Sequence, residues 1–107
     1  MSFAWIALTT AILLEVTGTL FLKSAGTGNP GAITVVTVGY LGSFVLLAYV
    51  LRTIEIGTTY AIWAGAGTAL IAAIGMVALG EAVTAVKVGS LALIVLGVVG
   101  LNLAGAH

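Results

Sequence analysis

The chain has 107 residues, of which 62% are hydrophobic and 6% are charged, with no cysteine and a formal net charge of zero. A soluble domain of this size needs about four times that share of charged residues to cover its surface, so the composition excludes a soluble globular protein. The lack of cysteine excludes disulfides and thiolate metal sites, and the lack of a basic cluster argues against nucleic-acid binding.

Long uncharged or nearly uncharged stretches dominate the sequence, and each is long enough to cross a bilayer: 1–22, 24–51, 56–80 and 88–106. Glycine, proline, asparagine and short polar connections between them predict turns. The expected helices cover about residues 3–22, 32–51, 56–79 and 85–104. The sequence therefore predicts an all-α, multi-pass integral membrane protein with a single four-helix transmembrane domain over residues 1–107.

Glu15 is the most informative residue of the first expected helix. A helix over residues 3–22 is about 30 Å long, so Glu15 lies only about 4 Å from its midpoint. An acid at that depth costs several kcal/mol, and such residues ordinarily face a bundle interior or a watery cavity and serve a function. The alternative is a structural acid hydrogen-bonded to a neighbouring helix. We favour the functional role because the chain offers no buried base to pair with it.

Residues three and four positions away share the helix face of Glu15. This face comprises Leu8, Ala11, Ile12, Gly18, Thr19 and Leu22. Its small members leave volume around the carboxylate or let another helix backbone approach. The face of Glu15 is therefore a candidate binding surface.

Aromatic and polar residues at helical spacing on the next two helices could complete a site. The second expected helix carries Tyr40, Ser43, Phe44 and Leu47, and the third carries Tyr60 and Trp63 one turn apart. A tyrosine hydroxyl can hold a carboxylate, and an indole face can hold a cation. The alternative for each aromatic is packing or an interfacial belt position, which we favour for Trp5 and Tyr49 near helix ends. Trp63 lies well inside its helix, so we favour a site there.

Small residues also mark the third and fourth expected helices. Gly65 and Gly67 interrupt the third helix and predict a hinge, because paired glycines weaken a helix, although close packing is an equal alternative. The fourth helix has no ionisable residue after Lys87 and carries small residues among Leu, Ile and Val. Since small-residue grooves let membrane helices associate, we assign this helix to dimerisation.

The charged loops bear on orientation and assembly. Four spans place Arg52 with both termini on one side of the membrane, and Lys23 with Lys87 on the other. This near-nil bias predicts insertion both ways round, although one extra lysine could fix a single orientation. Opposite insertion would let two copies form an antiparallel homodimer with inverted-repeat symmetry, in which two copies of Glu15 share one cavity near the midplane.

These residues resemble the small multidrug resistance transporters, in the quaternary-ammonium (EmrE-like) branch. The resemblance covers nearly the whole chain and rests on Lys23 and on residues 11–19, 60–67 and 90–98. It implies an antiparallel, dual-topology homodimer in the bacterial inner membrane. This dimer would export hydrophobic, aromatic cations such as quaternary ammonium compounds in exchange for protons, as a transporter rather than an enzyme, and without a cofactor or metal.

The resemblance also implies roles for individual residues. Glu15 would bind protons or substrate in alternation, with Tyr60 and Trp63 as its partners, and Tyr40 resembles a position of the quaternary-ammonium branch. The guanidinium branch usually has a tryptophan shortly after the glutamate, where this chain has Thr17, Gly18 and Thr19. The dimer contact would involve Ser90, Leu93, Ile94 and Gly97, with Ser90 replacing a glycine of the family pattern. Two further departures lie in the connections between helices. The first loop has Gly26-Thr27-Gly28-Asn29 in place of the family's common Gly-Phe-Thr-Arg run. Glu55 stands where a proline is frequent before the third helix.

One shared acid predicts proton-coupled exchange. An organic cation favours the charged carboxylate and displaces its protons. Two protons moving down one pH unit supply about 2.7 kcal/mol. Exchanging two protons for one monovalent cation adds about 2.3 kcal/mol per 100 mV. These energies suffice for export without ATP, and the sequence has no phosphate-binding loop.

Three alternatives stay open. The chain could be a guanidinium exporter, or a subunit that works only in a heteromeric pair of family members. A more distant alternative is a rotary-ring proteolipid, which also combines glycine-rich helices with one membrane carboxylate. Such subunits usually have two helices with the acid on the second, whereas here the acid lies on the first of four.

Overall fold

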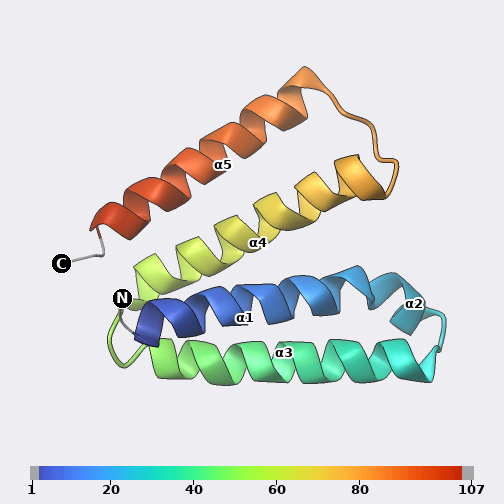
Figure 1. Ribbon diagram of the computed structural model, residues 1–107, viewed down its shortest axis with the longest axis horizontal. Coiled ribbons are helices and arrows are strands. Elements are labelled where there is room, and N and C mark those ends of the chain that lie inside the picture. Colours follow the sequence, from blue (N-terminus) through green and yellow to red (C-terminus); the bar gives the residue numbers. More distant parts are fainter. Residues whose placement is uncertain (1–2, 105–107) are drawn as a thin grey trace. The chain divides into compact units, whose positions relative to one another are not determined.

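The computed structural model describes residues 3–104, and within that range helices are the only regular secondary structure (Figure 1). Four helices are long and apolar enough to cross a membrane by length and composition: α1 (Phe3–Leu20), α3 (Pro30–Val50), α4 (Ile56–Ala78) and α5 (Ala85–Ala104). A short helix, α2 (Leu22–Gly26), follows α1. The prediction of an all-α integral membrane protein with four transmembrane helices is confirmed.

The first connection contains more helix than expected. Phe21 N donates a hydrogen bond of 3.0 Å to Gly18 O, three residues back instead of the four of an α-helix. α1 therefore ends at Leu20, two residues before the expected Leu22, and α2 occupies part of the predicted turn. At the start of α3, the Asn29 side chain accepts a hydrogen bond of 3.0 Å from Ala32 N. Pro30 is the first residue of α3, because a proline at that position has a suitable φ and needs no hydrogen-bond donor.

The last two long helices lie close to their expected bounds. α4 runs without a break through Gly65 and Gly67, so the expected interruption of its middle is not present. Gly80 has a φ of 73° directly after the helix, a conformation that glycine adopts without strain. Thr84 precedes α5, and its hydroxyl accepts a hydrogen bond of 3.1 Å from Lys87 N, which caps the first turn.

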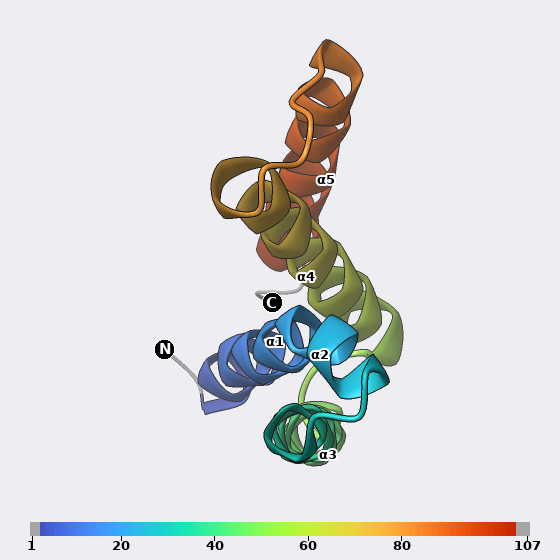
Figure 2. The same cartoon turned by 90° about the vertical axis from the view of Figure 1, so that its right-hand side faces the viewer.

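The chain divides into two compact units, one ending at Ile54 and the other beginning at Glu55. Within the first unit, α1 and α3 lie side by side with α2 next to their ends (Figure 2). A Cβ atom on Gly39 would lie 2.8 Å from Leu14 O and 3.5 Å from Gly18 Cα, so glycine allows the two backbones to approach closely. The single four-helix domain stays a prediction.

The second unit pairs α4 with α5. A Cβ atom on Gly65 would lie 2.9 Å from a methyl group of Val98, which shows that this glycine sits in a tight helix contact. α5 has no buried residue along its described length, so most of its surface away from α4 is accessible within the chain. This unit therefore presents a long apolar helix to whatever surrounds it.

Candidate functional site

The carboxylate of Glu15 lies in the second half of α1 and is half-buried. Thr19, one helical turn later, donates a hydrogen bond of 2.7 Å from its hydroxyl to Oε1 of Glu15. The two residues share a helix face, as their spacing predicts. The acid therefore has a hydroxyl donor on its own helix.

Tyr40 extends this contact to α3. Its hydroxyl oxygen lies 2.7 Å from Oγ1 of Thr19. A hydroxyl carries one donor hydrogen, and Thr19 uses its hydrogen on Glu15, so Tyr40 is the donor to Thr19. The three side chains form a directed series of hydrogen bonds from α3 to the acid, which we call the Tyr40–Thr19–Glu15 chain.

Two glycines make room for this chain. A Cβ atom on Gly18 would lie 2.9 Å from Cδ1 and Cε1 of Tyr40, so the tyrosine ring packs directly over the glycine. Gly39, the neighbour of Tyr40, lets α3 approach the backbone of α1 at Leu14. The close approach of the two helices brings the Tyr40 hydroxyl within reach of Thr19.

Other predicted members of the site lie along the same pair of helices. Leu8, Ala11 and Ile12 on α1 are buried. Ser43 on α3 is also buried, and its hydroxyl donates a hydrogen bond of 2.8 Å to Ala11 O, which ties the two helices together. Farther along α3, Leu47 is half-buried and Phe44 is 54% exposed.

Tyr60 and Trp63 lie one turn apart on α4, in the second compact unit. Their ring centroids are 5.7 Å apart with an angle of 51° between the planes, which is a tilted aromatic pair. Tyr60 is 63% exposed and Trp63 is half-buried. The pair offers an aromatic surface of the kind that holds organic cations. Its partnership with Glu15 stays a prediction.

The predicted hinge and dimer residues also belong to the second unit. Gly65 packs against Val98 and Gly67 is buried, so both sit in close contacts, and the hinge stays a prediction. The α5 residues assigned to the dimer are accessible or half-buried within the chain: Ser90, Leu93, Ile94 and Gly97. A dimer through this surface stays a prediction as well.

The sequence named Thr19 only as a small residue on the face of Glu15, and the structure adds its two hydrogen bonds. Gly39 was not singled out, although a glycine directly before a candidate tyrosine was an available signal. Over residues 3–104, no group of three or more His, Cys, Asp or Glu side chains could hold a metal ion. The chemistry of this site is that of one carboxylate, which can bind a proton or a cation.

Comparison with known proteins shows the family of the chain. The family model described as Small Multidrug Resistance protein matches residues 3–94. The multidrug resistance protein EbrB of Bacillus subtilis is 42% identical over 98 residues, covering 91% of this chain and 84% of that protein. The guanidinium exporter of Escherichia coli K12 is 41% identical over 103 residues, covering 94% and 96%. The nicotine metabolites export pump subunit NepB of Paenarthrobacter nicotinovorans is 40% identical over 102 residues, covering 94% and 61%.

Proposed function

We propose that this chain, which belongs to the small multidrug resistance family, exports small organic cations across the bacterial inner membrane in exchange for protons. The observation that carries the proposal is the Tyr40–Thr19–Glu15 chain, which presents one carboxylate within a membrane-spanning helix. A carboxylate in such a place needs either a proton or a cation to offset its charge. Competition of the two for Glu15 couples their movements.

The hydroxyls of the Tyr40–Thr19–Glu15 chain suit both states of the acid. When Glu15 is charged, Thr19 donates to it and Tyr40 donates to Thr19. When Glu15 is protonated, it can itself donate to Thr19, because a hydroxyl both donates and accepts. The direction of the hydrogen bonds then reverses without movement of a helix. The hydrogen bond between Glu15 and Thr19 can thus be kept as the acid exchanges its proton for a cation.

An antiparallel homodimer is the assembly that we propose. The loop lysines and arginine are almost balanced across the membrane, which permits both orientations. Two oppositely inserted copies have inverted-repeat symmetry, and such symmetry places a site near the midplane that opens alternately to each side. Glu15 from both copies would share that site. α5, which has no buried residue within the chain, would supply the contact through Ser90, Leu93, Ile94 and Gly97.

The substrates that we propose are hydrophobic, aromatic cations such as quaternary ammonium compounds. Gly18 and Thr19 stand where the guanidinium branch usually has a tryptophan, and the tilted pair of Tyr60 and Trp63 offers aromatic faces. The similarity to the E. coli guanidinium exporter favours a second candidate, guanidinium, which would require a smaller and more polar pocket. The similarity to EbrB, at nearly the same identity, favours the multidrug candidate.

Proton release on substrate binding tests both the exchange and the substrate class. We expect the purified protein to release protons when tetraphenylphosphonium is added, and to release fewer with guanidinium. Glu15→Gln should insert into the membrane and release none, because an amide cannot carry the exchanged proton. Glu55→Gln, which removes an acid outside the spans, is the matched control. The proposal would be overturned if Glu15→Gln released protons, or if the wild type released no protons with either ligand. Proton release with guanidinium only would favour the second candidate.

A heteromeric pair is a further candidate for the assembly, because NepB is described as a pump subunit. Reconstitution of this chain by itself distinguishes the two assemblies. The homodimer predicts that liposomes containing only this protein take up substrate when a pH gradient is applied. A requirement for a second family member would replace the homodimer by a pair.

A further inference from the structure

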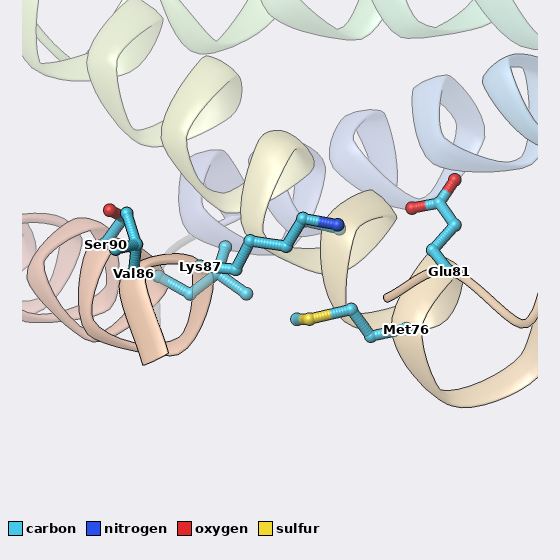
Figure 3. A pocket seen from close by; sticks show the side chains of 7 residues that line it. Met76, Glu81, Val86, Lys87 and Ser90 are labelled. Atoms are coloured by element: carbon cyan, nitrogen blue, oxygen red, sulfur yellow. The ribbon is translucent and has the colours of Figure 1, made fainter. Parts of the chain in front are cut away.

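The junction between α4 and α5 holds a pocket that the exchange at Glu15 does not use. The pocket has a volume of about 250 Å³ and is lined by Ala72, Met76, Glu81, Val86, Lys87, Ser90 and Leu91. Figure 3 shows Lys87 reaching from α5 toward α4, with Met76 and Glu81 on the α4 side. Two opposite charges therefore lie at one pocket, where two membrane-spanning helices end.

Both charged side chains are held in place. Lys87 Nζ donates a hydrogen bond of 2.8 Å to Ala82 O, which leaves two of the three ammonium donors for another partner. The backbone N–H of Glu81 donates to Gly75 O at 3.0 Å. A Cβ atom on Gly75 would lie 2.7 Å from the carboxyl carbon of Glu81, so the carboxyl group rests where only a glycine leaves room. The acid and the base therefore both have contacts within the chain before a ligand arrives.

A second hollow lies farther along the same two helices. It has a volume of about 400 Å³ and only apolar lining residues: Ala66, Ala69, Leu70, Ala73, Val95, Val98 and Val99. On α4, Ala69, Ala73 and Met76 share one helix stripe, and so the two hollows share a face of that helix. From Met76 to Ala66 is about 15 Å of helix, which is half of a hydrocarbon core of about 30 Å.

The charged pocket and the apolar hollow together are called the α4–α5 seam below. We propose that this seam binds a phospholipid with a zwitterionic headgroup of the phosphatidylethanolamine type. The lipid phosphate pairs with Lys87 and the lipid ammonium pairs with Glu81, while one acyl chain lies in the alanine- and valine-lined hollow. Basic residues between membrane helices bind lipid headgroups, and the paired acid adds a preference for a headgroup that also carries a cation. An organic cation would meet the like charge of Lys87, and an anionic lipid would meet that of Glu81.

Only part of the seam lies apart from the surface assigned to the dimer. On α5, Val95 and Val98 of the apolar hollow occupy another stripe than Leu93 and Gly97, by helical spacing. Val86 and Ser90 of the charged pocket share the stripe of Leu93 and Gly97. A second copy of the chain on that stripe is therefore the competing occupant of the charged pocket.

Native mass spectrometry of the purified protein tests the proposal. The protein is equilibrated with equal amounts of dioleoyl phosphatidylethanolamine and dioleoyl phosphatidylglycerol, and the retained lipids are counted. We expect the wild type to retain more phosphatidylethanolamine. Glu81→Gln should reduce this preference about threefold, the size of an exposed ion pair, and Lys87→Met should reduce retention of both lipids. Ala73→Phe, which fills the apolar hollow, should reduce retention regardless of headgroup.

Matched controls separate the seam from a general loss of charge. Glu55→Gln and Lys23→Met remove the same charges elsewhere in the chain, and both variants should retain lipid as the wild type does. Tetraphenylphosphonium binding at Glu15 should persist in every variant, which shows that each is folded. Equal lipid profiles for Glu81→Gln and Glu55→Gln would overturn the proposal. So would a Ser90→Cys variant that crosslinks fully between copies while the protein retains no lipid.

Discussion

The hydroxyl of Thr19 lies 2.7 Å from Oε1 of Glu15, one turn earlier on the same helix. Hydrogen bonds to a charged group contribute about 1.5–3 kcal/mol, more than bonds between neutral groups. This bond stabilises the charged carboxylate, which is the form that we propose to hold a cation. We therefore predict that Thr19 is a positioning residue that acts on substrate through Glu15.

Replacing Thr19 by valine keeps the shape of the side chain but removes the donor. We expect Thr19→Val to weaken tetraphenylphosphonium binding about tenfold, since about 1.4 kcal/mol corresponds to a factor of ten. Isothermal titration calorimetry measures this affinity. The matched control is Thr17→Val, because Thr17 is exposed and its hydroxyl bonds to Leu13 O at 2.8 Å. Equal affinities for the two variants would show that the bond to Glu15 contributes nothing.

Removal of the Tyr40 hydroxyl should act through Thr19. Tyr40→Phe retains the ring over Gly18 but loses the contact between helices, and such contacts in membrane proteins average about 0.6 kcal/mol. We expect tetraphenylphosphonium affinity to fall about threefold, with no further loss when Thr19→Val is already present. Tyr49→Phe on the same helix is the control, because its ring lies beside Arg52, 6.0 Å from the guanidinium carbon. Additive losses in the double variant would separate Tyr40 from Thr19.

The close approach of α1 and α3 predicts a stability effect at Gly39. Alanine there would place a Cβ atom 2.8 Å from Leu14 O, a backbone atom that cannot rotate away. We expect Gly39→Ala to lower the free energy of unfolding by about 1–3 kcal/mol, measured by denaturant titration in detergent micelles. Gly57→Ala, with nothing within 4 Å of its Cβ position, should instead be neutral or stabilising. A Gly39→Ala protein as stable as the Gly57→Ala protein would contradict a tight crossing.

Hydropathy alone was enough to predict the four spans, because the bilayer thickness sets how long each apolar segment must be. The depth of Glu15 follows from the same count. The start of α3 at Pro30 and the short α2 were not predicted, because residues 24–31 were all interpreted as a turn, whereas a proline suits the first position of a helix. Turn residues therefore predicted the helix ends less accurately than hydropathy predicted the spans.

The contact between Thr19 and Tyr40 could not be derived from helix periodicity. Periodicity places Thr19 on the face of Glu15, and it places Tyr40 on a stripe of α3 with Ser43 and Leu47. Which residues meet depends on how far α3 slides along α1. That offset is set by Gly39 against Leu14 and by Ser43 against Ala11, and neither pairing is visible in one helix by itself.

The near balance of loop charges makes orientation sensitive to one residue. From the count of four spans we expect Arg52 on the side of both termini, and Lys23 and Lys87 on the other side. A C-terminal tag should therefore be found on both faces of the membrane in the wild type. Arg52→Gln should place nearly all C-termini outside, because the loops with Lys23 and Lys87 then carry the whole bias toward the cytoplasm. Fusions to reporters that are active on only one side of the membrane measure the distribution.

Glu55→Gln, in the same loop as Arg52, should leave the distribution of C-termini unchanged because acids contribute little to orientation. A wild-type tag found on one side only would remove the basis for an antiparallel homodimer.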